Sequence, residues 1–137
     1  MAEKKKILIV DDDPDIVEAM RLPLESNGFE VVSASSGAEG LAVLKKESPD
    51  LMILDVMMEN TTEGFQVAYA VRSEDPNSEY KKHRDIPILM VTAINQVMKT
   101  KFAKQSDAEF LPVTDFIEKP VQPVDLLNKV ADLIAKK

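Results

Sequence analysis

The feature that most constrains this sequence is a short, uninterrupted apolar run, Leu51 to Leu54, which ends at the carboxylate of Asp55. The run follows Ser48-Pro49 and is too short for an ordinary helix, so it predicts a strand that is buried on both faces. Such strands occur in parallel sheets covered by helices, where ligands bind at the carboxyl ends of the strands. The alternative, that Asp55 only caps the next turn, stays open on this run alone.

Other segments repeat the pattern of an apolar run that ends in polar residues. Residues 6–10 lead into three consecutive acids, residues 86–91 into Thr92, and residues 115–118 into Lys119. Residues 29–34 form one more expected strand. Helical spacing fills the segments between the strands, so the β-α unit occurs five times. With right-handed crossovers, this alternation predicts an α/β fold whose parallel sheet has helices on both faces. One carboxyl edge should then collect the polar residues.

The helices have recognisable starts and ends. Asp13 and Pro14 open the first helix, which should end at Asn27-Gly28, with Pro23 expected to kink or shorten its last turns. A capping box over residues 36–39 opens the second. The third is expected over residues 64–74, a weak one over 95–105, and the last from residue 123, with a polar, exposed loop over 77–85. In the second helix, one face is expected to carry Ala38, Leu41 and Leu44. The inward-facing residues are expected to be Phe65, Ala68 and Val71 in the third helix and Leu127, Val130 and Ile134 in the last.

Composition excludes several classes of protein. The 137 residues suit one domain over residues 1–137, and no apolar run approaches the roughly 20 residues of a membrane span. Without a signal-peptide pattern, a cytoplasmic location is expected. The net charge of −7 argues against a nucleic-acid-binding surface. The chain has no Cys, its one His lies in a polar stretch, and its four glycines form no phosphate-binding loop. These absences argue against thiol chemistry, Ser-His-Asp catalysis and most nucleotide enzymes.

The acids that remain indicate phosphoryl chemistry. Asp11, Asp12 and Asp55 would repel one another at a shared edge, and a hard divalent cation relieves such repulsion. Oxygen-only ligands with open positions suit Mg²⁺, which keeps waters and accepts a phosphate ligand. A lysine and a hydroxyl opposite the acids would complete a phosphoryl cradle. A carboxylate nucleophile with Mg²⁺ and a lysine would form an aspartyl phosphate.

Four stretches, in order along the chain, resemble the receiver domains of bacterial response regulators, and the resemblance covers nearly the whole chain. They are Ile7-Leu-Ile-Val-Asp-Asp-Asp13-Pro14, Ile53-Leu-Asp55, Pro87-Ile-Leu-Met-Val-Thr92-Ala93 and Phe116-Ile-Glu-Lys119-Pro120. The resemblance implies a flavodoxin-like, doubly wound sheet of five parallel strands in the order 2-1-3-4-5, with five helices on two faces. The strand order is therefore carried over from the family.

The resemblance also implies a role for each site residue. Asp55 matches the phosphoacceptor and is also one of the expected Mg²⁺ ligands, and Asp12 matches a direct Mg²⁺ ligand. Asp11 matches a ligand that acts largely through water, and the backbone carbonyl of Met57 matches a further one. Thr92 matches the switch hydroxyl, Phe116 the switch aromatic and Lys119 the phosphate-binding lysine. Asp13 lies at a variable position of the family, and a helix-capping role is expected for it.

Three departures from the family concern the surface around the expected site. An extra residue follows the phosphoacceptor turn in residues 59–63, the loop over 75–85 is extended, and the Gly-Ala usually found before the fifth strand is replaced in residues 107–113. None of them changes the charged residues. The departures therefore bear on the output surface and leave phosphorylation expected.

Three alternative functions share some of these sequence features. A small Mg²⁺-dependent phosphohydrolase with Asp11 as nucleophile would also follow a strand with Asp-x-Asp, but it leaves Asp55 unexplained. A degenerate, unphosphorylated interaction module is disfavoured by intact Asp12, Asp55, Thr92 and Lys119. A calcium loop starting at Asp11 fails because its sixth position is Ile16 and its twelfth is Leu22.

The preferred hypothesis is a stand-alone phosphoacceptor domain of a two-component His-Asp phosphorelay. It would take its phosphoryl group from a histidine kinase or a histidine phosphotransfer protein, with Mg²⁺ as cofactor, and switch its surface for a downstream protein. It would be no enzyme in the usual sense, although it would assist its own phosphorylation and dephosphorylation. No direct contact with nucleic acid or membrane is expected.

Overall fold

A computed structural model describes residues 4–55, 63–73, 75–92, 115–118 and 121–136. The helix expected over 95–105 lies outside these ranges. The described strands are β1 (Lys6–Val10), β2 (Glu30–Ala34), β3 (Leu51–Asp55), β4 (Ile88–Thr92) and β5 (Asp115–Glu118). The described helices are α1 (Pro14–Ser26), α2 (Gly37–Glu47), α3 (Glu63–Arg72) and α5 (Pro123–Lys136), with a 3₁₀ turn, η1 (Lys81–His83).

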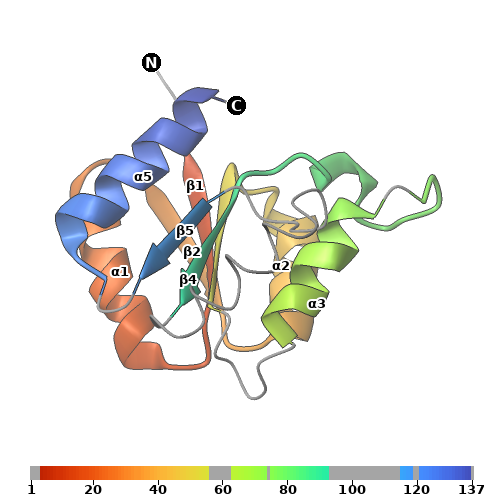
Figure 1. The fold of residues 1–137 in the computed structure, drawn as a ribbon, viewed down its shortest axis with the longest axis horizontal. Helices are drawn as coiled ribbons and strands as arrows, with labels where there is room; N and C mark the ends of the chain where they lie inside the picture. Colours follow the sequence, from red (N-terminus) through yellow and green to blue (C-terminus); the bar gives the residue numbers. More distant parts are fainter. Residues whose placement is uncertain (1–3, 56–62, 74, 93–114, 119–120, 137) are drawn as a thin grey trace, which may run out of the picture.

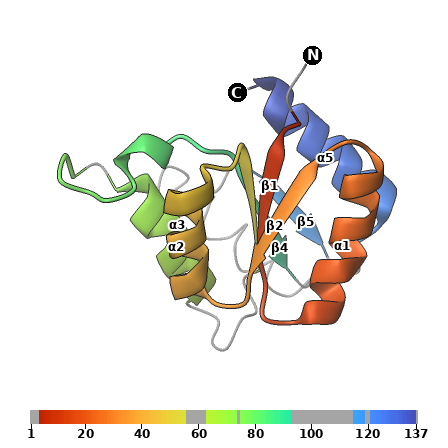
Figure 2. The ribbon, with the colours of Figure 1, turned by 180° about the vertical axis from the view of Figure 1, so that it is seen from behind.

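The strands form one parallel sheet in the order β2-β1-β3-β4-β5, the order that the resemblance implied. Helices α1 and α5 cover one face of this sheet, and α2 and α3 cover the other (Figure 1, and from behind in Figure 2). This arrangement confirms the expected doubly wound α/β fold. Among the described residues, no helix is long and apolar enough to cross a membrane.

Two separate apolar clusters lie on the two faces, because alternate residues of each strand point in opposite directions. Ile7 and Ile9 face α1 and α5, whereas Leu8 and Val10 face α2 and α3, and all four are fully buried. Leu51 to Leu54 in β3 are likewise fully buried. The short apolar runs are thus strands buried on both sides, as their length and composition predicted.

Helix α1 begins as expected but is not shortened. The carboxylate of Asp13 accepts a hydrogen bond from the backbone N–H of Asp15 at 2.9 Å, which confirms its capping role. The helix continues through Pro23 to Ser26, so of the two expected effects of this proline, a kink or a shortening, the shortening does not occur. An internal proline costs roughly 3 kcal/mol. Fully burying Met20 and Leu24 contributes roughly 1.5–3 kcal/mol each. Burial therefore outweighs the lost hydrogen bond.

Helix α2 packs more closely on the sheet than its apolar spacing predicted. Of the three residues expected on one face, Leu44 is buried and Leu41 is partly buried, but Ala38 is exposed. Gly40 faces the sheet instead. A Cβ atom at Gly40 would lie only 2.8 Å from Cγ2 of Val10 in β1. The helix backbone itself therefore contacts the strand that leads into the acidic residues.

Helix α5 turns a slightly different face to the sheet than predicted. Val130 is buried as expected, but Leu126 and Leu133 are the other buried residues. The predicted Leu127 and Ile134 are half-buried and pack against the same cluster, so the predicted inner face is confirmed, but its most buried residues lie one position earlier in the chain. The apolar stripe is wide enough to include all five side chains, and packing decides its centre. In α3, the predicted Ala68 and Val71 are buried, and the side chain of Phe65 lies outside the description.

Candidate functional site

The ends of β1 and β3 bring two acids to the same level of the sheet edge. The two strands are parallel neighbours with Val10 paired to Leu54, so Asp11 and Asp55 are the next residues along each strand. The backbone N–H of Asp11 donates to the carbonyl of Ala34 in β2 at 3.0 Å, which extends the β1–β2 pairing one residue beyond the strand. The two acids are thus positioned by the central, paired strands of the sheet.

Asp11, Asp12 and Asp55 form an acidic cluster. One carboxylate oxygen from each lies within 4.8 Å of the others. Asp11 and Asp55 are each only 2% exposed, whereas Asp12 is exposed to solvent. At this separation, two unit charges repel by roughly 3–4 kcal/mol if the effective dielectric constant is about 20. Such an arrangement favours binding of a hard cation, because a cation replaces repulsion between the acids with attraction.

Backbone groups hold the acidic loop in place. The backbone N–H of Asp13 donates to Oδ1 of Asp11 at 2.9 Å. The carboxylate of Asp13 points to the start of α1, where it accepts from the N–H of Asp15. The three consecutive acids therefore divide into two groups. Asp11 and Asp12 belong to the cluster, while Asp13 begins the helix.

The remaining predicted site residues are described only in part. Thr92 is the last residue of β4, one position beyond Val91, which pairs with Asp55, so its backbone reaches the same sheet edge. Phe116 pairs with Met90 across β4 and β5. The side chains of these two residues, and all of Met57 and Lys119, lie outside the described residues. The roles assigned to these four residues stay predictions.

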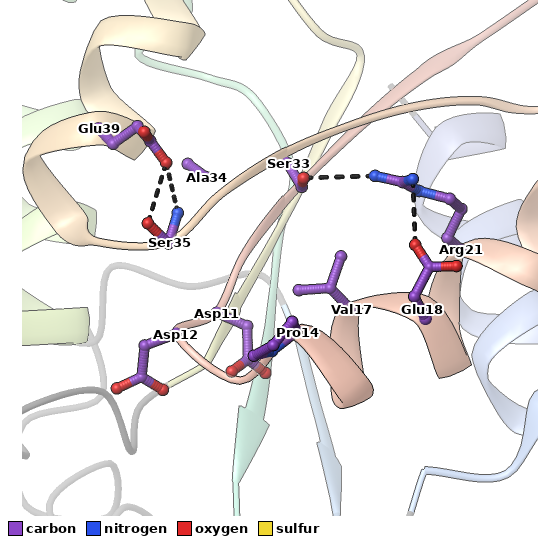
Figure 3. Close-up of a pocket in the computed structure, with 10 residues that line it drawn as sticks. All are labelled: Asp11, Asp12, Pro14, Val17, Glu18, Arg21, Ser33, Ala34, Ser35 and Glu39. Atoms are coloured by element: carbon purple, nitrogen blue, oxygen red, sulfur yellow. Dashed lines mark hydrogen bonds and ion pairs between the residues drawn. The ribbon is translucent and has the colours of Figure 1, made fainter.

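A groove of about 350 Å³ adjoins the acidic cluster (Figure 3). It runs between α1 and the start of α2, over the end of β2. Arg21 crosses it, with Nη1 at 3.1 Å from a Glu18 carboxylate oxygen and Nη2 donating to the Ser33 hydroxyl at 3.4 Å. Sequence reasoning missed Arg21 and Ser33, because neither lies in a motif and their proximity depends on how α1 packs on β2. Two residues of the acidic cluster, Asp11 and Asp12, also line the groove. Its other lining residues are Pro14, Val17, Glu18, Arg21, Ser33, Ala34, Ser35 and Glu39.

Comparison with solved structures gives close agreement over nearly the whole chain. A CheY-like response regulator receiver domain protein of Methanospirillum hungatei is 28% identical, with a TM-score of 0.77 over 98% of this chain and 96% of that one. The chemotaxis protein CheY4 of Vibrio cholerae is 32% identical, with a TM-score of 0.74 over 95% of this chain and 98% of that one. Both likenesses extend from one end of the fold to the other.

Curated relatives are longer proteins. A DNA-binding dual master transcriptional regulator of Synechocystis is 32% identical over 96% of this chain. An alkaline phosphatase synthesis transcriptional regulatory protein of Bacillus subtilis is 33% identical, also over 96%. In both cases the chain spans about half (49%) of the relative's length. The family model of the response regulator receiver domain matches residues 7–131, which include the three acids of the cluster. The chain therefore belongs to the family of response regulator receiver domains of two-component signalling.

Proposed function

We propose that this domain accepts a phosphoryl group on Asp55, with Mg²⁺ as cofactor, and passes the signal on through a change of its protein-binding surface. The donor is a histidine kinase or a histidine phosphotransfer protein. The proposal is supported most strongly by the convergence of three carboxylates within 4.8 Å at the ends of β1 and β3. Asp55 is the nucleophile, because it ends the central buried strand and lies beside a neighbouring pair of acids.

The spacing of the cluster fits one divalent ion. Two oxygens bound to the same Mg²⁺ lie at most about 4.2 Å apart, since each Mg–O distance is about 2.0–2.1 Å. The observed 4.8 Å limit is slightly larger, so small side-chain rotations bring the oxygens into range. Ca²⁺ has longer bonds and would also fit this spacing, but it takes about 6–8 oxygen ligands. Three carboxylates with water and phosphate oxygens suit Mg²⁺ better.

Each residue of the acidic cluster has a separate proposed role in phosphoryl transfer. A bound Mg²⁺ would supply positive charge that offsets the charge of the carboxylates and of the incoming phosphate. Exposed Asp12 and buried Asp11 would hold the ion, with the Met57 carbonyl as a further ligand. A carboxylate oxygen of Asp55 then attacks the phosphorus, and the bond from phosphorus to the donor imidazole nitrogen breaks. The electron pair of that bond stays on the nitrogen, the other ring nitrogen of the phosphohistidine already carries a proton, and so the imidazole leaves as a neutral ring while Asp55 carries the phosphoryl group as a mixed anhydride.

Thr92, Lys119 and Phe116 complete the proposal. Lys119 directly follows β5, so it would pair with the phosphoryl oxygens as a point charge. Thr92 would move toward the phosphoryl group, and Phe116 would follow it inward, because β4 and β5 are paired neighbours. In this scheme the two switch residues flank the segment over 95–114, which lies outside the described residues. Phosphorylation would shift an existing equilibrium of that surface.

The proposed partners are proteins. A net charge of −7 disfavours direct binding of this domain to nucleic acid. One relative is named as a DNA-binding regulator, and this chain matches only about half of it. An attached DNA-binding segment is therefore compatible with the proposal, whereas DNA contact by the domain itself is not part of it. The domain would act as a substrate and switch and not as a conventional enzyme, although its own residues would assist both phosphorylation and dephosphorylation.

Incubation with acetyl phosphate and Mg²⁺ tests the assignment. Intact mass should rise by one phosphoryl group, and Asp55→Asn should abolish the rise. Asp15→Asn is the matched control, because Asp15 is an exposed acid of α1 outside the cluster. It should be phosphorylated like the parent. Persistent labelling of Asp55→Asn at Asp11 would instead support the phosphohydrolase reading and contradict this one.

A further inference from the structure

The described residues between α3 and β4, 73 and 75–87, form a long loop, called the extended segment below, that several hydrogen bonds hold in place. At its base, Nη1 of Arg72 donates to the carbonyl of Arg84 at 2.5 Å, and Nε of Arg84 donates to the carbonyl of Ser73 at 2.9 Å. Farther out, the partly buried ring of Tyr80 packs against the apolar cluster under α2 and α3. The segment projects from the side of the domain formed by these two helices (Figures 1 and 2). The extended segment contributes no residue to the acidic cluster, so the cluster does not account for these contacts.

A basic hollow of about 330 Å³ lies between this segment and α2, and it is lined by Lys45, Ser78, Glu79, Lys81, Lys82 and His83. Three lysines and one glutamate give the lining a formal charge of +2 with the histidine neutral, in a chain whose net charge is −7. The exposed acids Asp75 and Asp85 of the same segment do not line it. The hollow is thus a local exception to an acidic surface.

One lysine of the basic hollow already binds a carboxylate. Nζ of Lys45 lies 2.6 Å from Oε1 of Glu79 and 6.0 Å from the centroid of the Tyr80 ring. Lys81 and Lys82 are exposed and form no ion pair within the described part of the chain. Two backbone hydrogen bonds hold the turn that presents them, from Lys81 to the Ser78 carbonyl at 3.3 Å and from His83 to the Tyr80 carbonyl at 2.8 Å. These two ammonium groups are therefore available to a ligand.

We propose that the basic hollow is a docking site for an acidic segment of a protein partner, whose carboxylates pair with Lys81 and Lys82. The contact between Glu79 and Lys45 is the same kind of interaction within the chain. The extended segment precedes β4, so the hollow lies at the amino edge of the sheet, opposite the edge that holds Asp55. The site would give a partner a second contact that is separate from the phosphoacceptor.

An acidic protein segment fits better than nucleic acid for two reasons. Specific DNA-binding proteins commonly neutralise about 6–10 phosphates, whereas this hollow offers two unpaired lysines, and the remaining net charge of the chain repels a polyanion. The volume is also at the small end of the roughly 300–1,000 Å³ found for ligand pockets. It accommodates one or two side chains and is too small for a duplex backbone.

A fluorescent peptide of about eight glutamates is the probe, and anisotropy with the full chain measures its binding at about 50 mM and about 300 mM salt. We expect binding that weakens with salt, and about a tenfold weaker affinity in the double variant Lys81→Glu, Lys82→Glu. The matched control is Lys4→Glu, Lys5→Glu, which reverses the same number of adjacent, exposed lysines elsewhere. It should lower the affinity much less. A glutamine peptide should not bind.

NMR chemical-shift changes of the backbone amides in the isotope-labelled chain show where the peptide binds. The proposal requires the largest shifts at residues 78–83 and similar binding by Asp55→Asn, because Asp55 lies at the other edge. If both double variants lose the same amount of peptide affinity, net charge alone controls the binding and the proposal is overturned. Failure of the peptide to bind would overturn it as well. So would a short DNA duplex that binds more tightly than the peptide and loses affinity in the Lys81, Lys82 variant.

Discussion

The contact between α2 and β1 leaves no room for a side chain at Gly40. An added Cβ would lie 2.8 Å from Cγ2 and 3.1 Å from Cγ1 of Val10, against about 3.5–4.0 Å for ordinary carbon contacts. Val10 is fully buried and stiff at χ1, so it cannot rotate away cheaply. Overpacking of this kind costs about 1–3 kcal/mol, while alanine gains about 1 kcal/mol over glycine inside a helix. Gly40→Ala should therefore destabilise the domain by about 1 kcal/mol.

The same substitution should change sign when Val10 is shortened. In a Val10→Ala background both γ-carbons are absent, so the clash disappears and the helix-propensity gain remains. Gly40→Ala should then stabilise the variant by up to about 1 kcal/mol. The coupling energy of the double-mutant cycle would be about 1–3 kcal/mol, within the range of residues in direct contact.

Urea unfolding of the parent, both single variants and the double variant measures this cycle. Ala42→Gly is the control for helix propensity, because Ala42 is exposed in the same helix. It should cost about 1 kcal/mol in either background. If Gly40→Ala stabilises the parent as much as it stabilises the Val10→Ala variant, the close approach of α2 to β1 does not control this position and the reasoning is wrong.

Two further predictions concern ions and pH. Mg²⁺ at about ten times its dissociation constant should raise the free energy of unfolding by about 1.4 kcal/mol. Asp12→Asn should lose most of that gain in urea titrations; an undiminished gain would exclude Asp12 as a ligand. At the other sheet edge, the hydrogen bond from Lys6 Nζ to Glu47 at 2.9 Å lowers the pKa of Glu47 below its ordinary 4.5 and raises the pKa of Lys6. The carboxylate's stabilising effect is therefore present above pH 4.5 and is lost as the pH falls through the lowered pKa. Glu47→Gln should destabilise at about pH 7 and match the parent more closely at about pH 3, and a difference that does not change with pH would contradict this.

Much of the fold could be predicted from local patterns. The strands stand out because short apolar runs between turn signals have few other stable arrangements. Their ends depend on pairing, which the sequence shows less directly. β4 was expected from Ile86 but begins at Ile88, because Pro87 has no N–H to donate and only its carbonyl pairs, accepting from Met52 at 2.9 Å.

Helix faces were harder to predict because several apolar residues compete for the inward position. In α2, the absence of a side chain decides the packing, and a hydrophobicity pattern gives Gly40 no weight. The capping box shows a similar limit. Ser36 caps the backbone N–H of Glu39 at 3.1 Å as expected, but the Glu39 carboxylate accepts from the N–H of Ser35, one residue earlier than the usual pattern. Such details follow from the exact path of the chain into the helix.

The acidic cluster was predictable because its members follow strands that must be neighbours in a parallel sheet. Their separation and the contrast between buried Asp55 and exposed Asp12 required the structure. The groove beside Arg21 and the basic hollow beside Lys81 could not be predicted. Each joins residues that are distant in sequence. Surface lysine, arginine and serine residues occur in no sequence pattern that shows which of them lie together in the fold.

The burial of the central strands on both faces has a consequence for how the sheet aligns. Because both faces are apolar, sliding β3 by one residue along β1 would exchange Ile53 and Leu54 between two clusters that accept either residue at little cost. A slide in the direction that sets Asp55 opposite Val10 would also move its carboxylate, already only 2% exposed, away from the sheet edge and among fully buried residues, where an uncompensated carboxylate costs several kcal/mol. The acids thus help to determine the register of β3 along β1, which hydrophobicity alone leaves ambiguous. The residues that are proposed to carry out the chemistry therefore also disfavour an alignment in which Asp55 would no longer lie level with Asp11.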